Sequence, residues 1–184
     1  MQSSDQQRYS DGGRVYLRPL LEEDVNEEYL SWFKDSAVVH FLDSRNITHE
    51  DAVNYIRQGR ETGQWYMYAV IYAENDTHIG NLKVGPIQSA HKTSDLVTVI
   101  GKPDYWGKGL ATEAIRIGNK VAFEVYDIRK LSGGIAEKNI GSIKCYTSAG
   151  WVIEARLKGH HLINGEPEDR VCVSCFNPKY FPDV

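Results

Sequence analysis

Gly-Lys-Pro-Asp-Tyr-Trp-Gly-Lys-Gly-Leu-Ala-Thr-Glu-Ala, residues 101–114, is the stretch that decides the fold. An apolar segment, residues 96–100, precedes it, and residues 111–125 place apolar side chains at helical spacing. The stretch therefore joins a buried strand to an amphipathic helix through a glycine-rich turn. Glycines let main-chain N–H groups converge, and the helix start adds unpaired N–H groups and the positive end of its dipole. Together these groups bind a diphosphate without needing basic side chains.

The spacing of the glycines excludes two common phosphate-binding loops. Gly107 and Gly109 are not followed by the Gly-Lys-Ser/Thr of a Walker loop. A GxGxxG loop is excluded because Thr112 stands where its third glycine would be. Taken alone, the two glycines favour a tight turn without a ligand, so the surrounding sequence has to decide between the two interpretations.

Periodicity and turn signals predict the remaining elements. We expect helices over residues 22–34, from Thr48 through residue 56, and over 140–149. Asn164 and Gly165 supply a hairpin turn. The further strands expected are 14–18, 64–73, 78–84, 131–136, 151–157 and 170–176. The strand, helix, strand passage around residues 111–125 requires a right-handed crossover and one parallel pair in an otherwise antiparallel sheet. The class is α+β, with a flexible tail over residues 1–12 and one domain over 13–184.

Composition narrows the function classes. The chain has 184 residues, 41% hydrophobic and 25% charged, and no apolar run approaches the ~18 residues of a membrane helix. Its 21 basic and 25 acidic residues give a net charge of −4, which offers no basic field for nucleic acid. Three cysteines, Cys145, Cys172 and Cys175, indicate no disulfide scaffold and favour a reducing cytoplasm. On a strand the last two face opposite ways, so we expect packing rather than metal or redox chemistry.

The motif around the glycine turn resembles that of the GNAT superfamily of acyl-CoA-dependent N-acetyltransferases. The family motif Gln/Arg-x-x-Gly-x-Gly/Ala is matched by Trp-Gly-Lys-Gly-Leu-Ala at residues 106–111. Trp at the first position is usual in the branch of ribosomal-protein N-terminal (Rim-type) and amino-sugar acetyltransferases. The resemblance covers about residues 14–176. It implies a mixed α/β fold, with a mostly antiparallel twisted sheet, one splayed parallel strand pair and about four flanking helices. It also implies acetyl-CoA as cosubstrate, an amine as acceptor and no metal.

The resemblance also implies the residues that bind CoA. The main chain of the glycine turn would hold the diphosphate, and N–H groups at the end of the preceding strand would bind the acetyl oxygen. The segment Asn-x-x-Ser-x-x-x-Tyr at residues 139–146 matches a family spacing in which the Asn bonds the pantetheine arm. The CoA-binding residues expected are Val99, Ile100, Gly101, Trp106, Gly107, Lys108, Gly109, Leu110, Ala111, Thr112, Asn139 and Ser142.

Two residues are expected to carry the chemistry. By the same resemblance Tyr146 lies near the CoA sulfur, where a phenol of pKa ~10 can protonate a departing thiolate. Asp95 stands where the branch commonly has a Glu that deprotonates the amine, directly or through water; a strand-capping turn is its alternative role. Gly133 and Gly134 exclude a carboxylate on the following strand. A covalent route through Cys145 is disfavoured, because adjacent residues point about 100° apart around a helix.

The acceptor is less constrained than the cosubstrate. We rank amino sugars or other small amines first, then a protein N-terminus, then antibiotics. A CoA-binding or sensor module without chemistry, and a nucleotide-binding protein using the same loop, are the alternatives. We expect no nucleic-acid or membrane partner. The oligomeric state, a homodimer included, and the role of His160 and His161 stay open.

Overall fold

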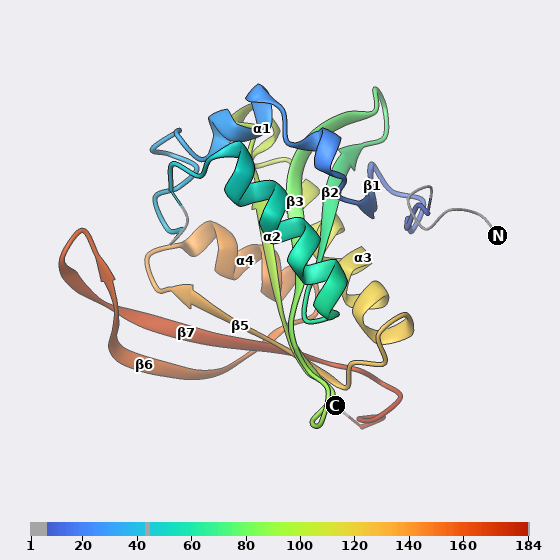
Figure 1. Ribbon diagram of the computed structural model, residues 1–184. Coiled ribbons are helices and arrows are strands. Elements are labelled where there is room, and N and C mark those ends of the chain that lie inside the picture. Colours follow the sequence, from blue (N-terminus) through green and yellow to red (C-terminus); the bar gives the residue numbers. More distant parts are fainter. Residues whose placement is uncertain (1–6, 43–44, 184) are drawn as a thin grey trace.

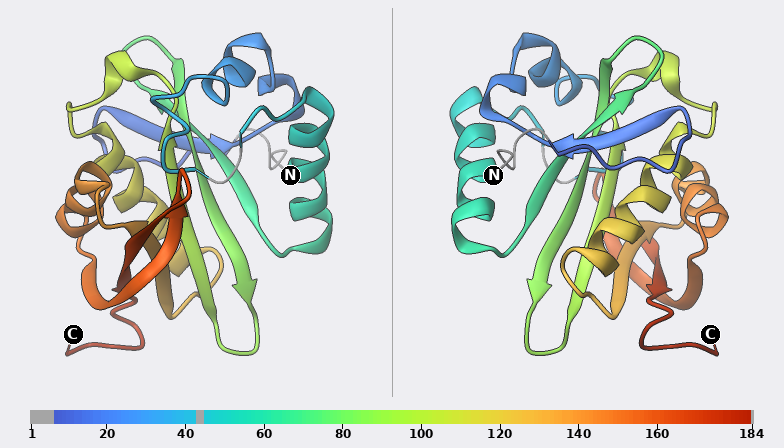
Figure 2. Two further views of the ribbon diagram at one scale, coloured as in Figure 1. Left: turned by 90° about the vertical axis from the view of Figure 1, so that its left-hand side faces the viewer. Right: turned by 90° about the vertical axis from the view of Figure 1, so that its right-hand side faces the viewer.

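A seven-stranded sheet in the order β1-β2-β3-β4-β5-β7-β6 forms the centre of the fold. In this computed structural model, which describes residues 7–42 and 45–183, neighbouring strands are antiparallel except for β4 and β5. The strands are β1 Val15–Pro19, β2 Tyr66–Tyr72, β3 Thr77–Gln88, β4 Thr93–Ile100, β5 Lys130–Ala136, β6 Val152–Ile163 and β7 Glu166–Phe176. The helices are η2 Glu22–Asp24, α1 Glu27–Trp32, α2 His49–Thr62, η3 Pro103–Tyr105, α3 Leu110–Glu124 and α4 Ile140–Ser148. Figures 1 and 2 show α1 and α2 on one face of the sheet and α3 and α4 on the other.

Two hydrophobic cores hold the helices to the sheet. The larger lies under α3 and α4 and the smaller under α1 and α2. At Gly118 of α3, an added Cβ would come within 2.6 Å of Leu82 and 3.1 Å of Leu96. The helix therefore packs in direct contact with β3 and β4, and this contact fixes its start beside the end of β4.

β4 and β5 separate after a short ladder. Their parallel pairing covers three residue pairs, from Thr93 with Lys130 to Asp95 with Ser132. Beyond them β4 continues to residue 100 and β5 to residue 136 without pairing to each other. One side of β4 therefore keeps main-chain groups that no strand uses, which confirms the predicted splayed parallel pair.

The helix expected over residues 22–34 is interrupted, because local caps stop it. Asp24 accepts the N–H of Leu21 at 2.8 Å, which closes the short η2 turn. Asn26 then caps α1 by accepting the N–H of Tyr29 at 3.0 Å. The prediction of one continuous helix is wrong here. The side chains of Asp24 and Asn26 bind main-chain N–H groups that would otherwise bond to carbonyls within the helix.

Other local predictions agree with the structure. Thr48 and Asp51 form the predicted capping box of α2, and Asn164 and Gly165 turn with positive φ values of 52° and 84°. The strand expected at 96–100 begins earlier, at Thr93, so it includes Asp95. Residues 1–6 of the expected tail lie outside the described residues, and Tyr9 exchanges two main-chain bonds with Leu17 at 2.8 Å each. Among the described helices, none has the length and apolar character to cross a membrane.

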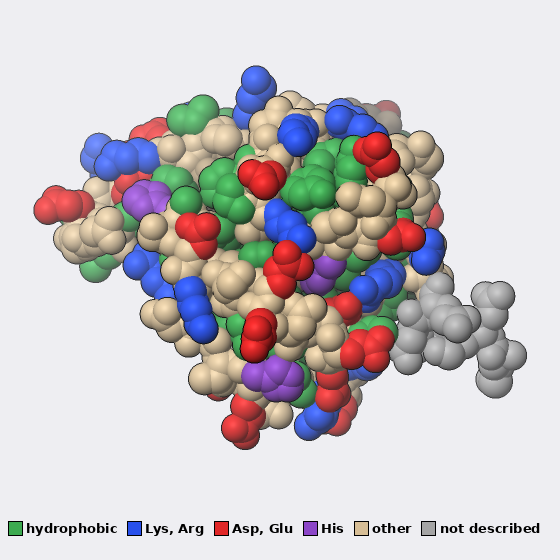
Figure 3. Space-filling model, turned by 90° about the horizontal axis from the view of Figure 1, so that it is seen from above, with side chains coloured by type: hydrophobic (Ala, Val, Ile, Leu, Met, Phe, Trp, Pro, Cys, Tyr) green, Lys and Arg blue, Asp and Glu red, His purple; other side chains and the backbone are tan. Residues whose placement is uncertain are grey.

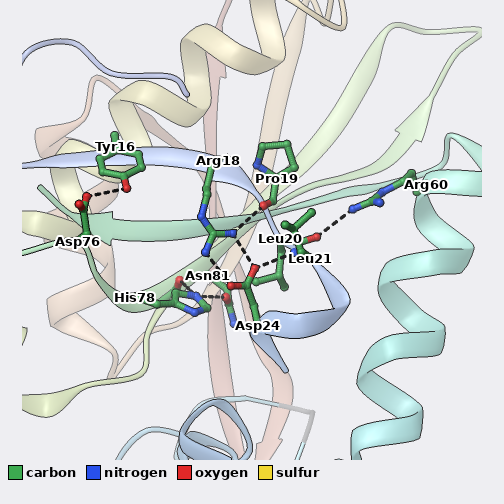
Figure 4. A network of polar contacts seen from close by, with 11 residues as sticks. Tyr16, Arg18, Pro19, Leu20, Leu21, Asp24, Arg60, Asp76, His78 and Asn81 are labelled. Carbon is green, nitrogen blue, oxygen red and sulfur yellow. Dashed lines mark hydrogen bonds and ion pairs between the residues drawn. The ribbon is translucent and has the colours of Figure 1, made fainter. Parts of the chain in front are cut away.

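A half-buried ion pair joins β1 to η2 (Figure 4). Arg18 donates to both carboxylate oxygens of Asp24 at 2.7 Å, and the N–H of Leu21 adds a third bond. Burial raises the pKa of Asp24, but the bonds from Arg18 and Leu21 together outweigh burial and hold it below its ordinary value. The pair therefore contributes stability in its ionised form.

Asp24→Asn should lower the free energy of unfolding at pH 7 by about 1.5–3 kcal/mol, because a hydrogen bond to a charged group typically contributes this much to stability. Because the pKa is depressed in the folded state, this contribution is present above the unfolded pKa and is lost as pH falls through the folded pKa. Urea unfolding at pH 7 and at pH 2 measures the difference. Glu22→Gln, which removes the exposed pair with Arg57, is the control and should change little. A difference from the wild type that is equally large at pH 2 would contradict the assignment.

Candidate functional site

The glycine turn presents unpaired main-chain donors at the start of α3. Gly107 and Gly109 have φ values of 70° and 79°, a region that L side chains rarely adopt. Gly109 is the N-cap of α3, and no side chain caps this helix. No hydrogen bond within the described part of the chain takes up the N–H groups of residues 107–112. Several N–H groups and the positive end of the helix dipole are therefore free to bind an anion.

Side chains from other elements hold the turn in place. Arg14 donates to the carbonyl of Lys108 at 2.9 Å and forms an ion pair with Glu113 in the first turn of α3. The indole of Trp106 donates to the carbonyl of Ile100 at 2.8 Å, although the residue as a whole is 42% exposed. The turn is thus tied to the start of β1 and to the end of β4. The pairing of Arg14 with Glu113 could not be predicted from the sequence, because the two residues are 99 positions apart and no local pattern links them.

The free edge of β4 is identified by two bonds that point away from β3. Leu96 accepts from Tyr146, and Ile100 accepts from the tryptophan of the turn. Because successive main-chain groups of a strand point to opposite sides, Thr98 shares this orientation and its N–H faces the gap. The strand therefore supplies N–H groups of Thr98 and Ile100 where it separates from β5.

This geometry corrects part of the predicted set of donors. The N–H of Gly101 donates to the carbonyl of Ile79 at 2.9 Å, so it is not available to a ligand. Val99 lies opposite Asn81 in the ladder with β3, and by the same alternation its N–H also points toward β3. Of the three expected donors only Ile100 faces the gap, because the register of β3 decides which main-chain groups stay free.

Tyr146 lies at the gap on the side of α3 and α4. Its ring is 5% exposed and meets Trp151 edge to face at 4.9 Å between centroids. Its hydroxyl donates to the carbonyl of Leu96 at 2.9 Å. Burial raises the pKa of Tyr146, and the adjacent Thr98 offsets part of that rise. The phenol therefore keeps its proton at neutral pH and holds it directly beside the gap.

Asn139 and Ser142 begin α4 on the other side of the gap. Asn139 is the N-cap, and its Oδ1 accepts the N–H of Ser142 at 3.1 Å. This capping bond uses the carbonyl oxygen, so the NH₂ group of Asn139 remains a donor without a described partner. The structure thus gives Asn139 a structural role that the sequence analysis did not assign, and its expected bond to pantetheine stays a prediction.

Asp95 lies inside β4, at the last residue pair before the strands separate. It is half-buried on the face opposite Leu96, and no hydrogen bond to its carboxylate occurs among the described residues. Burial raises the pKa of Asp95 above its ordinary value, while the charges of Lys83 and Arg170 act against that rise. The carboxylate and the tyrosine hydroxyl thus occupy opposite faces of the sheet at the mouth of one gap.

The cysteines and histidines form no further centre. Cys175 is buried, which raises its pKa to about 11, and Cys172 lies on the opposite face of β7. No cluster of three or more His, Cys, Asp or Glu in residues 7–42 and 45–183 could hold a metal ion. His160 lies 3.5 Å from Arg170, and His78 is fixed under α1 by a 3.0 Å contact with Asn81. Figure 3 shows the molecule from above the view of Figure 1. Acidic and basic side chains are mixed over this face, so neither positive nor negative charge dominates it.

The chain is similar in sequence and in fold to known acetyltransferases. A sequence model of the acetyltransferase (GNAT) domain matches residues 14–152. The chain belongs to this GNAT family. A probable N-acetyltransferase of Bacillus subtilis, YjcK, is 25% identical over 175 residues, which cover 91% of this chain and 96% of that protein. Spermidine N(1)-acetyltransferase of Escherichia coli K12 is 27% identical over 104 residues, 56% of this chain and 55% of that protein.

Solved structures share the fold of this GNAT domain. Spermidine N-acetyltransferase from Vibrio cholerae, in complex with CoA and spermine, has a TM-score of 0.81 at 19% identity, covering 91% of this chain and 98% of that one. Ribosomal-protein-S5-alanine acetyltransferase from Vibrio fischeri has a TM-score of 0.82 at 16% identity, covering 95% and 99%. The predicted family, fold class and enzyme class are therefore confirmed: the protein is an acetyltransferase of the GNAT type.

Proposed function

We propose that this GNAT protein moves the acetyl group of acetyl-CoA to a primary amine by direct attack in a ternary complex. The observation that carries the proposal is the run of unpaired main-chain donors along β4 and the glycine turn. This run begins where β4 and β5 separate, between Asp95 and Tyr146, and ends at the first turn of α3. A thioester, an extended amide arm and a diphosphate need donors in this order.

CoA enters from the side of α3 and α4. The N–H groups of residues 107–112 bind its diphosphate, and the NH₂ group of Asn139 donates to an amide carbonyl of the pantetheine arm. Ser142, in the first turn of α4, lies beside that arm. The thioester then reaches the gap, where the N–H groups of Thr98 and Ile100 stabilise negative charge on its oxygen as the amine attacks.

The acceptor amine approaches from the opposite face. Asp95 takes a proton from the amine, directly or through one water, and the freed lone pair attacks the thioester carbon. As the carbon–sulfur bond breaks, Tyr146 exchanges its bond to Leu96 for one to sulfur and delivers its proton there. The nitrogen, which becomes positively charged on attack, loses its second proton to water as the amide forms, and Tyr146 regains a proton from water. Placing acid and base on opposite faces keeps the two proton transfers apart. Relatives named for spermidine and for ribosomal-protein-S5 alanine support an amine as acceptor.

Binding and turnover test the proposal separately. Titration calorimetry should show one site for acetyl-CoA, and thermal shifts should be larger with acetyl-CoA than with ATP or NAD. A thiol-release assay with a panel of amines should then show acetyl transfer. Folded protein that gives no heat with acetyl-CoA would exclude the function. Binding without thiol release from any amine would leave a CoA-binding module instead.

Gly109→Ala should weaken acetyl-CoA binding by about 10–100-fold, because a side chain at φ 79° costs about 1–3 kcal/mol and the turn can relieve that strain by rearranging. Gly150→Ala is the matched control, since Gly150 also has a positive φ, 91°, with open space around it after α4. Both variants should lose similar stability, but only Gly109→Ala should lose affinity in calorimetry. Equal affinities would show that the turn does not bind CoA.

A further inference from the structure

Arg170 of β7 lies across the bare main chain of β5, on the face where the acceptor is proposed to bind. A Cβ added at Gly134 would come within 1.9 Å of Arg170 Nε and 2.1 Å of its Cζ and Nη2. The guanidinium therefore lies against β5 at a position that only glycine permits. Gly134 therefore does more than exclude a catalytic carboxylate from β5: its missing side chain leaves the room that the guanidinium of Arg170 occupies.

Among residues 7–42 and 45–183, this guanidinium has no carboxylate partner. Its Nε is buried without a hydrogen-bond partner, and its Nη1 lies 3.5 Å from Nε2 of His160, longer than a good hydrogen bond. Within the described ranges no acidic oxygen lies within 4 Å of it, unlike four other cations on β5, on β6 and in the loop after β5. Those four are paired: Lys130 with Glu154, Lys138 with Glu168, Arg156 with Glu137 and Lys158 with Asp169.

The carboxylate on the same face of the sheet is Asp95: burial raises its pKa, and the charges of Lys83 and Arg170 act against that rise. Asp95 pairs in register with Ser132, and Gly134 lies two residues further along β5 on the same face. Two residues of strand span ~7 Å. The two charges therefore lie on one face of the sheet, about two strand residues apart, a separation that one small zwitterion can bridge.

We propose that the acceptor is an amino acid, with its amine at Asp95 and its carboxylate bound by Arg170. The inference rests on the proposed acetyl transfer and names its substrate class. A carboxylate one carbon from the amine would reach the Nη groups while the amine hydrogen-bonds to Asp95, each contact spanning about 2.7–2.9 Å. Lys83, held by the hydroxyl of Tyr55 at 3.1 Å, adds a second positive charge near Asp95. A polyamine would instead place its second cation against Arg170, which disfavours it.

Matched pairs of acceptors test this inference. Each L-amino acid of a panel is compared with the amine that lacks its carboxylate, and with spermidine, in the thiol-release assay. The wild type should favour the amino acid of each pair in kcat/KM by about 10–100-fold, the usual range for a bond to a charged group. Arg170→Met should remove that preference mainly through KM, leave the Kd for acetyl-CoA unchanged, and leave the simple amines unaffected.

Two further variants separate the inference from folding effects. Arg170→Lys keeps the charge and should retain part of the preference, whereas Arg156→Gln removes an exposed, paired arginine of β6 and should leave it intact. Faster release with spermidine or simple amines than with amino acids would overturn the inference and leave acetyl transfer standing. Failure of acetyl-CoA to bind would overturn the proposed function and this inference with it.

Discussion

Replacing Tyr146 with Phe should lower turnover about 10²–10³-fold while the Kd for acetyl-CoA changes less than about threefold. The hydroxyl contributes to the reaction only when a thiolate forms, so its loss affects the transition state and not the bound thioester. Burial raises the pKa of Tyr146, so its proton stays in place until negative charge develops on sulfur beside it. The ring itself, packed on Trp151, is kept by the substitution.

Steady-state kinetics and calorimetry on the same preparation measure the two quantities. Tyr126→Phe is the matched control, because the Tyr126 hydroxyl is also bonded, to Tyr68 at 2.5 Å, but lies beyond the other end of α3. It should leave turnover unchanged. If Tyr146→Phe reduced affinity and turnover by equal factors, the hydroxyl would act in binding and another group would protonate the sulfur.

Asp95→Asn should lower kcat/KM at least about 10²-fold and remove the acidic limb of its pH profile. The wild-type base must be ionised, and burial raises the pKa of Asp95. Activity should therefore fall, as pH decreases, at a higher pH than an ordinary aspartate of pKa ~3.9 would give. Rate measurements from pH 4 to pH 9 with acetyl-CoA and the best acceptor give this profile.

Stability separates this catalytic role from a structural one. A carboxyl whose pKa is raised on folding opposes the folded state when it is ionised, so the wild type gains stability as pH falls through that pKa. Asp95→Asn should accordingly be at least as stable as the wild type at pH 7, with its advantage shrinking at acid pH. Asp104→Asn, in exposed η3, is the control for kinetics. An Asp95→Asn enzyme with full activity and an unchanged acidic limb would exclude Asp95 as the base.

The features that could be predicted from the sequence depend on neighbours within a few residues. The capping box depends only on hydrogen bonds between Thr48 and Asp51, three residues apart. The hairpin turn depends only on the positive φ values of the adjacent residues Asn164 and Gly165. The glycine turn before α3 has the same local character. The helix over residues 22–34 failed as a prediction because the competing cap at Asn26 was overlooked and because the carboxylate of Asp24 is held by Arg18 of β1.

The sequence by itself therefore determined the order of elements, the parallel pair and the position of the glycine turn, since periodicity, capping and turn residues act within short segments. Only the tertiary structure decided which N–H groups of β4 face the gap, because the register with β3 directs that of Gly101 to Ile79 and turns that of Thr98 away from β3. It also decided what surrounds Asp95. Arg170 reaches the same face from β7, and no spacing along the chain reports that two strands so far apart in sequence share a sheet.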